Sequence, residues 1–215
     1  MYTMDNEDVL PTLTQWGYGE SMWDRLGGTM ATPTILSNQL ESVKESLLWP
    51  FHSSEKILVC PKDAVEQKGS KKNLYNLRNI YVTSYIWNLS VIAYGKTPQV
   101  GGQYRTLKLG QFKATDILQW EADEMKPFFF NDSWSFPDEG ISQRHGGGQS
   151  KNERTDVGGG ASVGTYGGSA EHITYRRYYE LAGEVDKRGR PLKDEELPND
   201  LWNDPMDSKR GGAFQ

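Results

Sequence analysis

The residues that can build a hydrophobic core are distributed very unevenly along this chain of 215 residues. Leucine, isoleucine, valine and phenylalanine together number 43, and 33 of them precede residue 138. Ten glycines then fall within the 29 residues from Gly140 to Gly168, where each loses much backbone freedom on ordering. We therefore expect a β-rich core domain over 1–137, a Gly-rich linker or arm over 138–170, and a charged extended tail over 171–215.

The segment from Ile80 to Tyr94 has the clearest secondary-structure pattern. It lacks Gly and Pro and is rich in β-branched and aromatic residues, which favour strands. Trp87, Leu89 and Val91 alternate with residues of the opposite face, which is the period of a strand with one buried side. We predict a central strand or strand pair here. Further strands are predicted over residues 56–60, 104–109 and 126–130.

Two helices are also predicted, and the fold class follows from the balance of elements. The helices cover residues 39–49 and 114–125, and Pro50 and Pro127 end them. Since predicted strands outnumber helices, we expect a mainly β fold: an antiparallel β-sandwich, jelly-roll-like, with one or two short helices and a Gly-rich extended C-terminal arm. An α+β domain is the alternative.

Composition and charge exclude several classes of protein. No apolar stretch approaches 18 residues, and the acidic N-terminus does not resemble a secretory signal. The net charge of −5 argues against a dedicated nucleic-acid domain. A single cysteine, Cys60, rules out an intrachain disulfide, and His52, His145 and His172 are too scattered to suggest a metal site. We expect no cofactor and no metal.

The motifs that suggest chemistry are incomplete. Gly95-Lys96-Thr97 looks like the end of a phosphate-binding loop, but Ser90 occupies the position of the first glycine and Pro98 blocks the following helix, so a turn is expected.

Neither the acidic residues nor the cysteine indicates catalysis. Glu121 and Glu124 would be neighbours on the second helix, where they are expected to be solvated charges rather than a catalytic pair. Cys60 ends a predicted strand beside Pro61 and is interpreted as a buried apolar residue. No catalytic residue is therefore predicted.

The tail contains one short predicted strand, from His172 to Tyr179, in which two adjacent arginines lie between tyrosines. Such a pattern can stack on single-stranded bases or on another protein chain. We interpret the aromatic and cationic residues of this region as a possible interface. It comprises Tyr166, Tyr175, Arg176, Arg177, Tyr178, Tyr179 and Trp202.

The overall make-up is similar to that of viral coat proteins with β-sandwich shells, although this similarity is compositional only. It implies a non-enzymatic structural subunit of a large assembly, most simply a capsid protein. The expected location is a virion or the host cell interior, or otherwise the cytoplasm. The expected partners are copies of the chain or other subunits, with weak nucleic-acid contact through Arg176 and Arg177 and no membrane. The alternatives are a protein-binding accessory subunit and a hydrolase with an unrecognised site.

Overall fold

The computed structural model of the protein describes residues 2–27, 30–92, 94–95, 97–98, 104–146, 159–183 and 197–213. The chain divides into two units. Unit 1 comprises Met1–Ile86, Ala93–Gln111 and Glu124–Trp134, and unit 2 comprises Trp87–Ile92, Phe112–Asp123 and Ser135–Gln215. Each unit therefore contains stretches that are distant in sequence.

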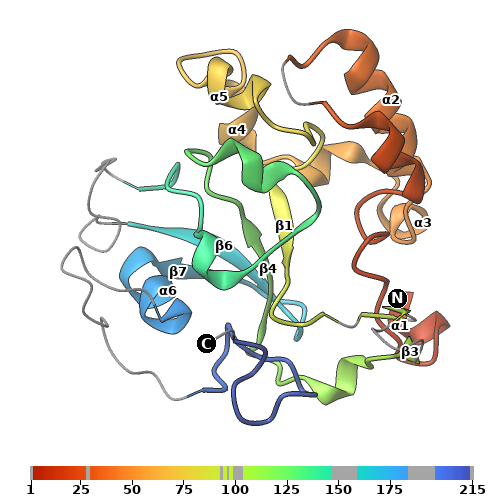
Figure 1. Ribbon diagram of the computed structural model, residues 1–215, viewed down its shortest axis with the longest axis vertical. Coiled ribbons are helices and arrows are strands. Elements are labelled where there is room, and N and C mark those ends of the chain that lie inside the picture. Colours follow the sequence, from red (N-terminus) through yellow and green to blue (C-terminus); the bar gives the residue numbers. More distant parts are fainter. Residues whose placement is uncertain are drawn as a thin grey trace. The chain divides into compact units, whose positions relative to one another are not determined.

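Unit 1 consists mainly of short helices (Figure 1). They are α1 (Tyr2–Asp5), η1 (Glu20–Arg25), α2 (Pro33–Lys44), α3 (Trp49–His52), η2 (Glu55–Leu58), α4 (Pro61–Glu66), α5 (Lys72–Asn76), η3 (Leu109–Gln111) and η4 (Pro127–Phe130). Strands β2 (Thr97–Pro98) and β3 (Tyr104–Arg105) form a short antiparallel ladder.

The longest helix of unit 1, α2, begins at a clear sequence signal. The Thr32 side chain accepts a hydrogen bond from the Ile35 N–H at 3.2 Å, and Pro33 supplies a pre-set backbone angle at the first helical position. The helix packs against η1, where the Gly19 N–H donates to the Ser42 carbonyl at 2.7 Å. The predicted helix over 39–49 is therefore present, but it begins and ends earlier, and Pro50 does not end it.

Unit 2 is built on a sheet. The five strands have the order β5-β1-β4-β6-β7, and the sheet is mixed and open. Strands β4 (Ile117–Glu121), β6 (Gly160–Thr165) and β7 (Ala170–Thr174) belong to unit 2 and pair antiparallel. At β1 (Tyr85–Asn88) and β5 (Trp134–Ser135) the chain passes from one unit to the other. The 3₁₀ turn η5 (Pro137–Glu139) follows β5.

A helix covers part of this sheet. Helix α6 (Tyr175–Ala182) contacts β6 and β7 (Figure 1). Thr174 ends β7 and caps the helix, because its hydroxyl accepts the Arg177 N–H at 3.2 Å. Gly160 lies opposite this point, and a Cβ there would come within 2.0 Å of the Ile173 carbonyl oxygen. Glycine is thus required at the start of β6 by close backbone approach.

The predicted fold class is wrong. Helices account for 34% of the residues and strands for 14%, around a single open five-stranded sheet, so the protein is not a mainly β sandwich or jelly roll. Residues 56–60 and 126–130, predicted as strands, contain the 3₁₀ helices η2 and η4. The similarity to viral coat proteins depended on a sandwich shell, so the interpretation as a capsid or virion protein loses its basis and is not kept.

Two further segments have a different secondary structure from the one predicted. The predicted helix over 114–125 is instead strand β4, because pairing with β6 and a bond from the Ile117 N–H to the Asp200 carbonyl outweigh a helical spacing of apolar residues. The predicted strand from His172 to Tyr179 is β7 only as far as Thr174, after which the cap begins α6.

The buried strand predicted around Trp87 is present but short. Among the described residues of this segment only Tyr85–Asn88 forms a strand. Trp87 and Val91 are buried as predicted, whereas Leu89 is half-buried, and Asn88 and Ser90 of the opposite face are buried as well. Asn88 ends the strand because its side chain donates to two carbonyls, those of Ile117 and Leu201, at 2.9 and 2.7 Å. A buried amide that donates to one carbonyl of β4 and one of the 197–213 loop thus replaces the expected continuation of the strand.

The expected extended arm is not what the described parts of the C-terminal region form. Residues 159–183 contain β6, β7 and α6, and residues 197–213 are a hydrogen-bonded loop within unit 2. Residues 147–158 and 184–196, which the linker and tail predictions also include, lie outside the described residues. The domain boundaries after 137 and 170 stay a prediction.

Across the described ranges, no helix has both the length and the apolar character needed to cross a membrane.

Candidate functional site

The most distinctive polar group of unit 2 is the carboxylate of Glu121, the last residue of β4. Its side chain is only 2% exposed, although ionised carboxylates are costly to bury without partners. Trp120, the preceding residue, lies opposite Val163 of β6, which fixes the end of the strand. Glu121 is therefore held on the sheet rather than on a loop.

A turn over residues 140–146 brings two partners to this carboxylate. The Ser142 N–H donates to the Glu121 backbone carbonyl at 2.9 Å, and the indole of Trp120 donates to the Gly140 carbonyl at 3.2 Å. A further bond, from the Gly146 N–H to the Gln143 carbonyl at 3.1 Å, closes the turn. The sheet thus positions the turn through one backbone bond and one bond from an indole side chain.

The two partners are consecutive residues of the turn. Arg144 Nη1 donates to Glu121 Oε2 at 2.6 Å, and His145 Nε2 lies 2.9 Å from Oε1. The Arg144 side chain is fully buried, whereas that of His145 is 26% exposed. The carboxylate therefore connects a buried cation to an imidazole that reaches solvent.

The geometry determines which nitrogen of His145 is basic. A carboxylate can only accept hydrogen bonds, so the hydrogen in the contact with Glu121 belongs to Nε2. In the neutral ring Nδ1 then holds the lone pair that can take up a proton. A carboxylate that orients an imidazole in this way also stabilises the imidazolium that forms on proton uptake. Glu121 and His145 together therefore supply the groups that a general base requires.

The aromatic residues of the predicted interface are buried within unit 2 itself. Tyr175, Tyr178 and Tyr179 form the inner face of α6, and the Tyr178 hydroxyl donates to the Pro137 carbonyl at 3.0 Å. Tyr166 stacks on Phe112 with ring centroids 3.8 Å apart.

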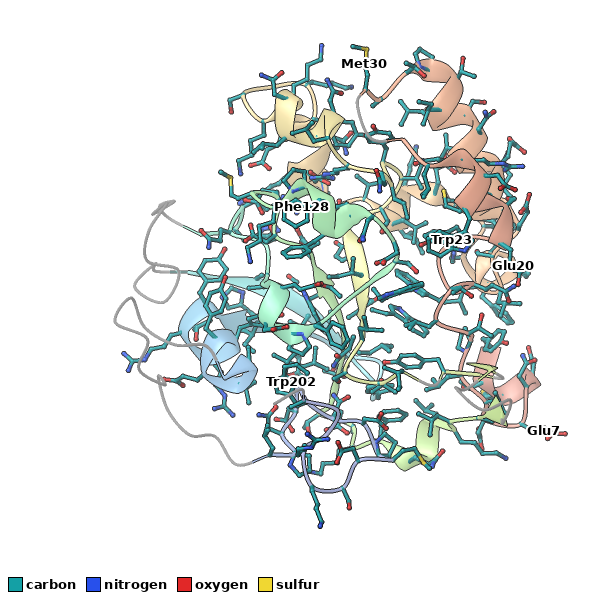
Figure 2. All side chains as sticks on the ribbon, in the orientation of Figure 1. Glu7, Glu20, Trp23, Met30, Phe128 and Trp202 are labelled. Atoms are coloured by element: carbon teal, nitrogen blue, oxygen red, sulfur yellow. The ribbon has the colours of Figure 1, made fainter. Side chains whose placement is uncertain are left out.

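The remaining residues of the predicted interface are one buried tryptophan and two exposed arginines. The Trp202 indole (Figure 2) donates to the Ala182 carbonyl at 3.2 Å. Arg176 and Arg177 are exposed, so an interface through these two residues stays a prediction.

Unit 1 contains a second buried ion pair. Asp63 accepts two bonds from Arg78, at 2.8 and 2.9 Å, and one from the Ser84 hydroxyl at 2.6 Å. The Arg78 guanidinium also lies 3.8 Å from the centroid of the Phe130 ring. Since both ionic side chains are almost fully buried and neither reaches solvent, we interpret this pair as structural.

Cys60 lies near this pair and is 2% exposed, as predicted. Its backbone N–H donates to the Ser84 hydroxyl at 3.1 Å. Cys60 itself is the residue directly before helix α4.

The expectation that Glu121 and Glu124 are solvated neighbours on a helix is wrong. Both carboxylates are buried, and they belong to different units. Glu124 pairs with Lys71 at 2.8 Å, and Lys71 also binds Glu66 at 2.9 Å.

Sequence reasoning missed the link between Glu121 and His145 because 24 residues separate them and no local spacing signals the contact. The only usable signal is that Arg144 and His145 are adjacent, a cation beside a titratable ring.

Comparisons of the chain with protein-family models, with curated proteins and with solved structures found no match.

Proposed function

We propose that the protein is a hydrolase in which His145, oriented by Glu121, acts as the general base. The observation that supports this is the 2.9 Å contact between a buried strand carboxylate and an imidazole that reaches solvent. In the Asp63–Arg78 pair, which we interpret as structural, neither side chain reaches solvent. The proposal replaces the expectation of a non-enzymatic subunit.

The proposed step is a proton transfer. His145 Nδ1 takes a proton from an attacking water molecule as the water oxygen bonds to the substrate carbonyl carbon. The imidazolium then gives that proton to the leaving group as the bond between this group and the carbonyl carbon breaks and the carbonyl re-forms. Glu121 holds the ring in one tautomer and offsets its positive charge, while Arg144 fixes the carboxylate from the buried side.

The test is ester hydrolysis, with p-nitrophenyl acetate as the probe. His145→Ala should lower kcat/KM by about 10²-fold, because removal of a positioned general base typically costs that much or more. The variant should fold, since the His145 side chain is partly exposed. Thermal unfolding followed by circular dichroism checks this point.

His172→Ala is the matched control. His172 is an exposed histidine of β7 in the same unit, so it reports the hydrolysis that any surface imidazole supports. Equal rates for the two variants and the unchanged protein would contradict the proposal. Glu121→Gln is a poor substitute, because it leaves the buried Arg144 cation without a charged partner.

A further inference from the structure

The turn over residues 140–146, which brings His145 to Glu121, is itself buried. Each residue from Ile141 to Arg144 is buried, and Ser142 has no exposed surface. A backbone N–H at such a depth needs an acceptor within the protein. The acceptors that the turn uses therefore determine its conformation.

Ser142 is bonded both to the strand and to the turn. Its N–H donates to the Glu121 backbone carbonyl at 2.9 Å, and its hydroxyl oxygen accepts the Arg144 N–H at 3.3 Å. A serine hydroxyl that accepts the N–H two residues further along stabilises a turn by a local bond. Ser142 thus connects the end of β4 to the backbone immediately before His145.

The backbone is held on both sides of His145. The Arg144 N–H is bonded on one side, and on the other the Gly146 N–H donates to the Gln143 carbonyl at 3.1 Å. The His145 side chain itself is 26% exposed, so the protein surrounds the ring only in part. The orientation of the imidazole therefore depends on where the turn places the backbone of His145.

We propose that Ser142 is a positioning residue, whose hydroxyl holds the turn in the conformation that places the His145 imidazole on Glu121. Ser142 acts through the backbone, not by touching a substrate. The consequence for catalysis rests on the proposed hydrolase function, whereas the placement of the ring can be observed without any substrate.

Loss of the hydroxyl should release the ring in a defined way. The buried Arg144 N–H loses an acceptor that it uses, and because this is costly the backbone moves toward other acceptors. Such a movement takes the ring away from Glu121 Oε1, which lies 2.9 Å from His145 Nε2. An imidazole bonded to a carboxylate keeps its hydrogen on the bonded nitrogen, whereas an unbonded neutral ring exchanges between two tautomers.

Nitrogen-15 NMR of the imidazole tests this in the full-length Ser142→Ala variant. Spectra are recorded at about pH 9, above the usual range of histidine titration, so that the rings are neutral. In the unchanged protein, His145 Nε2 should have the chemical shift of a protonated nitrogen and Nδ1 that of an unprotonated one. In Ser142→Ala both shifts should move toward the averaged values of N-acetylhistidine methylamide. A His145→Ala variant assigns the signals.

Ser90→Ala is the matched control. Ser90 is another buried serine of unit 2, and its hydroxyl donates to the Leu201 carbonyl at 3.2 Å. This variant loses a comparable bond outside the turn, so it should keep the His145 shifts of the unchanged protein. The proposal is overturned by an unchanged tautomer in Ser142→Ala, by an equal change in Ser90→Ala, or by averaged shifts in the unchanged protein.

Hydrolysis of p-nitrophenyl acetate separates this inference from the proposed function. Ser142→Ala should lower kcat/KM by about 3- to 10-fold, the effect of one hydrogen bond, and Ser90→Ala should not. If the unchanged protein is no faster than His145→Ala but the tautomer changes in Ser142→Ala, the hydrolase function fails and the positioning role stands. If the unchanged protein is faster than His145→Ala, while hydrolysis and tautomer are both unchanged in Ser142→Ala, the positioning role alone fails.

Discussion

Asp116 shows how a single buried carboxyl makes stability depend on pH. Burial raises the pKa of Asp116, and the nearby Asp200 acts in the same direction, while the Lys113 N–H that it accepts lowers it. A raised pKa means that the folded state binds the proton more tightly than the unfolded chain does. The stabilising contribution of Asp116 is therefore complete below its unfolded pKa and is lost as the pH rises through the folded pKa.

The variant Asp116→Asn tests the direction of this pH dependence. The amide oxygen of asparagine can still accept the Lys113 N–H, but the buried charge is removed. Relative to the unchanged protein, the free energy of unfolding of the variant should increase between about pH 4 and pH 7. Urea denaturation of both proteins at each pH measures this difference. A difference that decreases with rising pH would contradict the assignment.

The stability of helix α6 depends on the residue that caps its N-terminus. Replacing Thr174 by alanine removes the side-chain oxygen that accepts the Arg177 N–H and should lower the free energy of unfolding by about 1 kcal/mol. Thr174→Ser keeps the oxygen and should restore most of that stability. Denaturant midpoints of the three proteins decide the question, since a serine variant as unstable as the alanine variant would assign the loss to the methyl group.

Local patterns located some elements but fixed neither their ends nor, in one case, their type. For α2, the apolar periodicity indicated a helix, but the predicted stop at Pro50 was wrong, because the helix ends well before it. The period of two identified Trp87 as buried, but Asn88 on the opposite face is buried too. The segment that became β4 had the same kinds of signal as α2, an apolar spacing and a following proline. Ile117 and Trp120 are three residues apart, a spacing that suits a helix, and only pairing with β6 decides for a strand.

The candidate site could not be predicted from the sequence, for a related reason. Glu121 was expected to face solvent on a helix, so nothing indicated a buried carboxylate at a strand end. Its partners come from a turn that is placed by backbone bonds, including the one from the Ser142 N–H. Backbone hydrogen bonds between distant segments cannot be recognised from the local composition of the sequence. The burial of the α6 tyrosines was missed likewise, because the cap at Thr174 was not recognised as a helix start.

The whole molecule is an interleaved chain, and this limits what a fragment can do. A peptide of residues 135–215 contains β6, β7 and α6 but lacks β4, the strand that pairs with β6. It also lacks the Asn88 amide that binds the Leu201 carbonyl.

We therefore expect the peptide 135–215 alone to be unfolded, with poorly dispersed amide resonances and no cooperative thermal transition. A fragment that unfolds cooperatively would show that these residues form a domain by themselves. Full-length protein under the same conditions is the reference.

The interleaving also sets an order for folding during synthesis. Unit 1 has all of its residues once Trp134 has been made, whereas unit 2 contains chain from Trp87 onward but lacks β6 and β7 until much later. Strand β6 ends at Thr165, 31 residues after Trp134, and at about 5 to 20 residues per second this stretch takes on the order of 2 to 6 s to synthesise. During that interval the edge of β4 that pairs with β6 stays open, with backbone groups that other nascent chains or a chaperone can pair with.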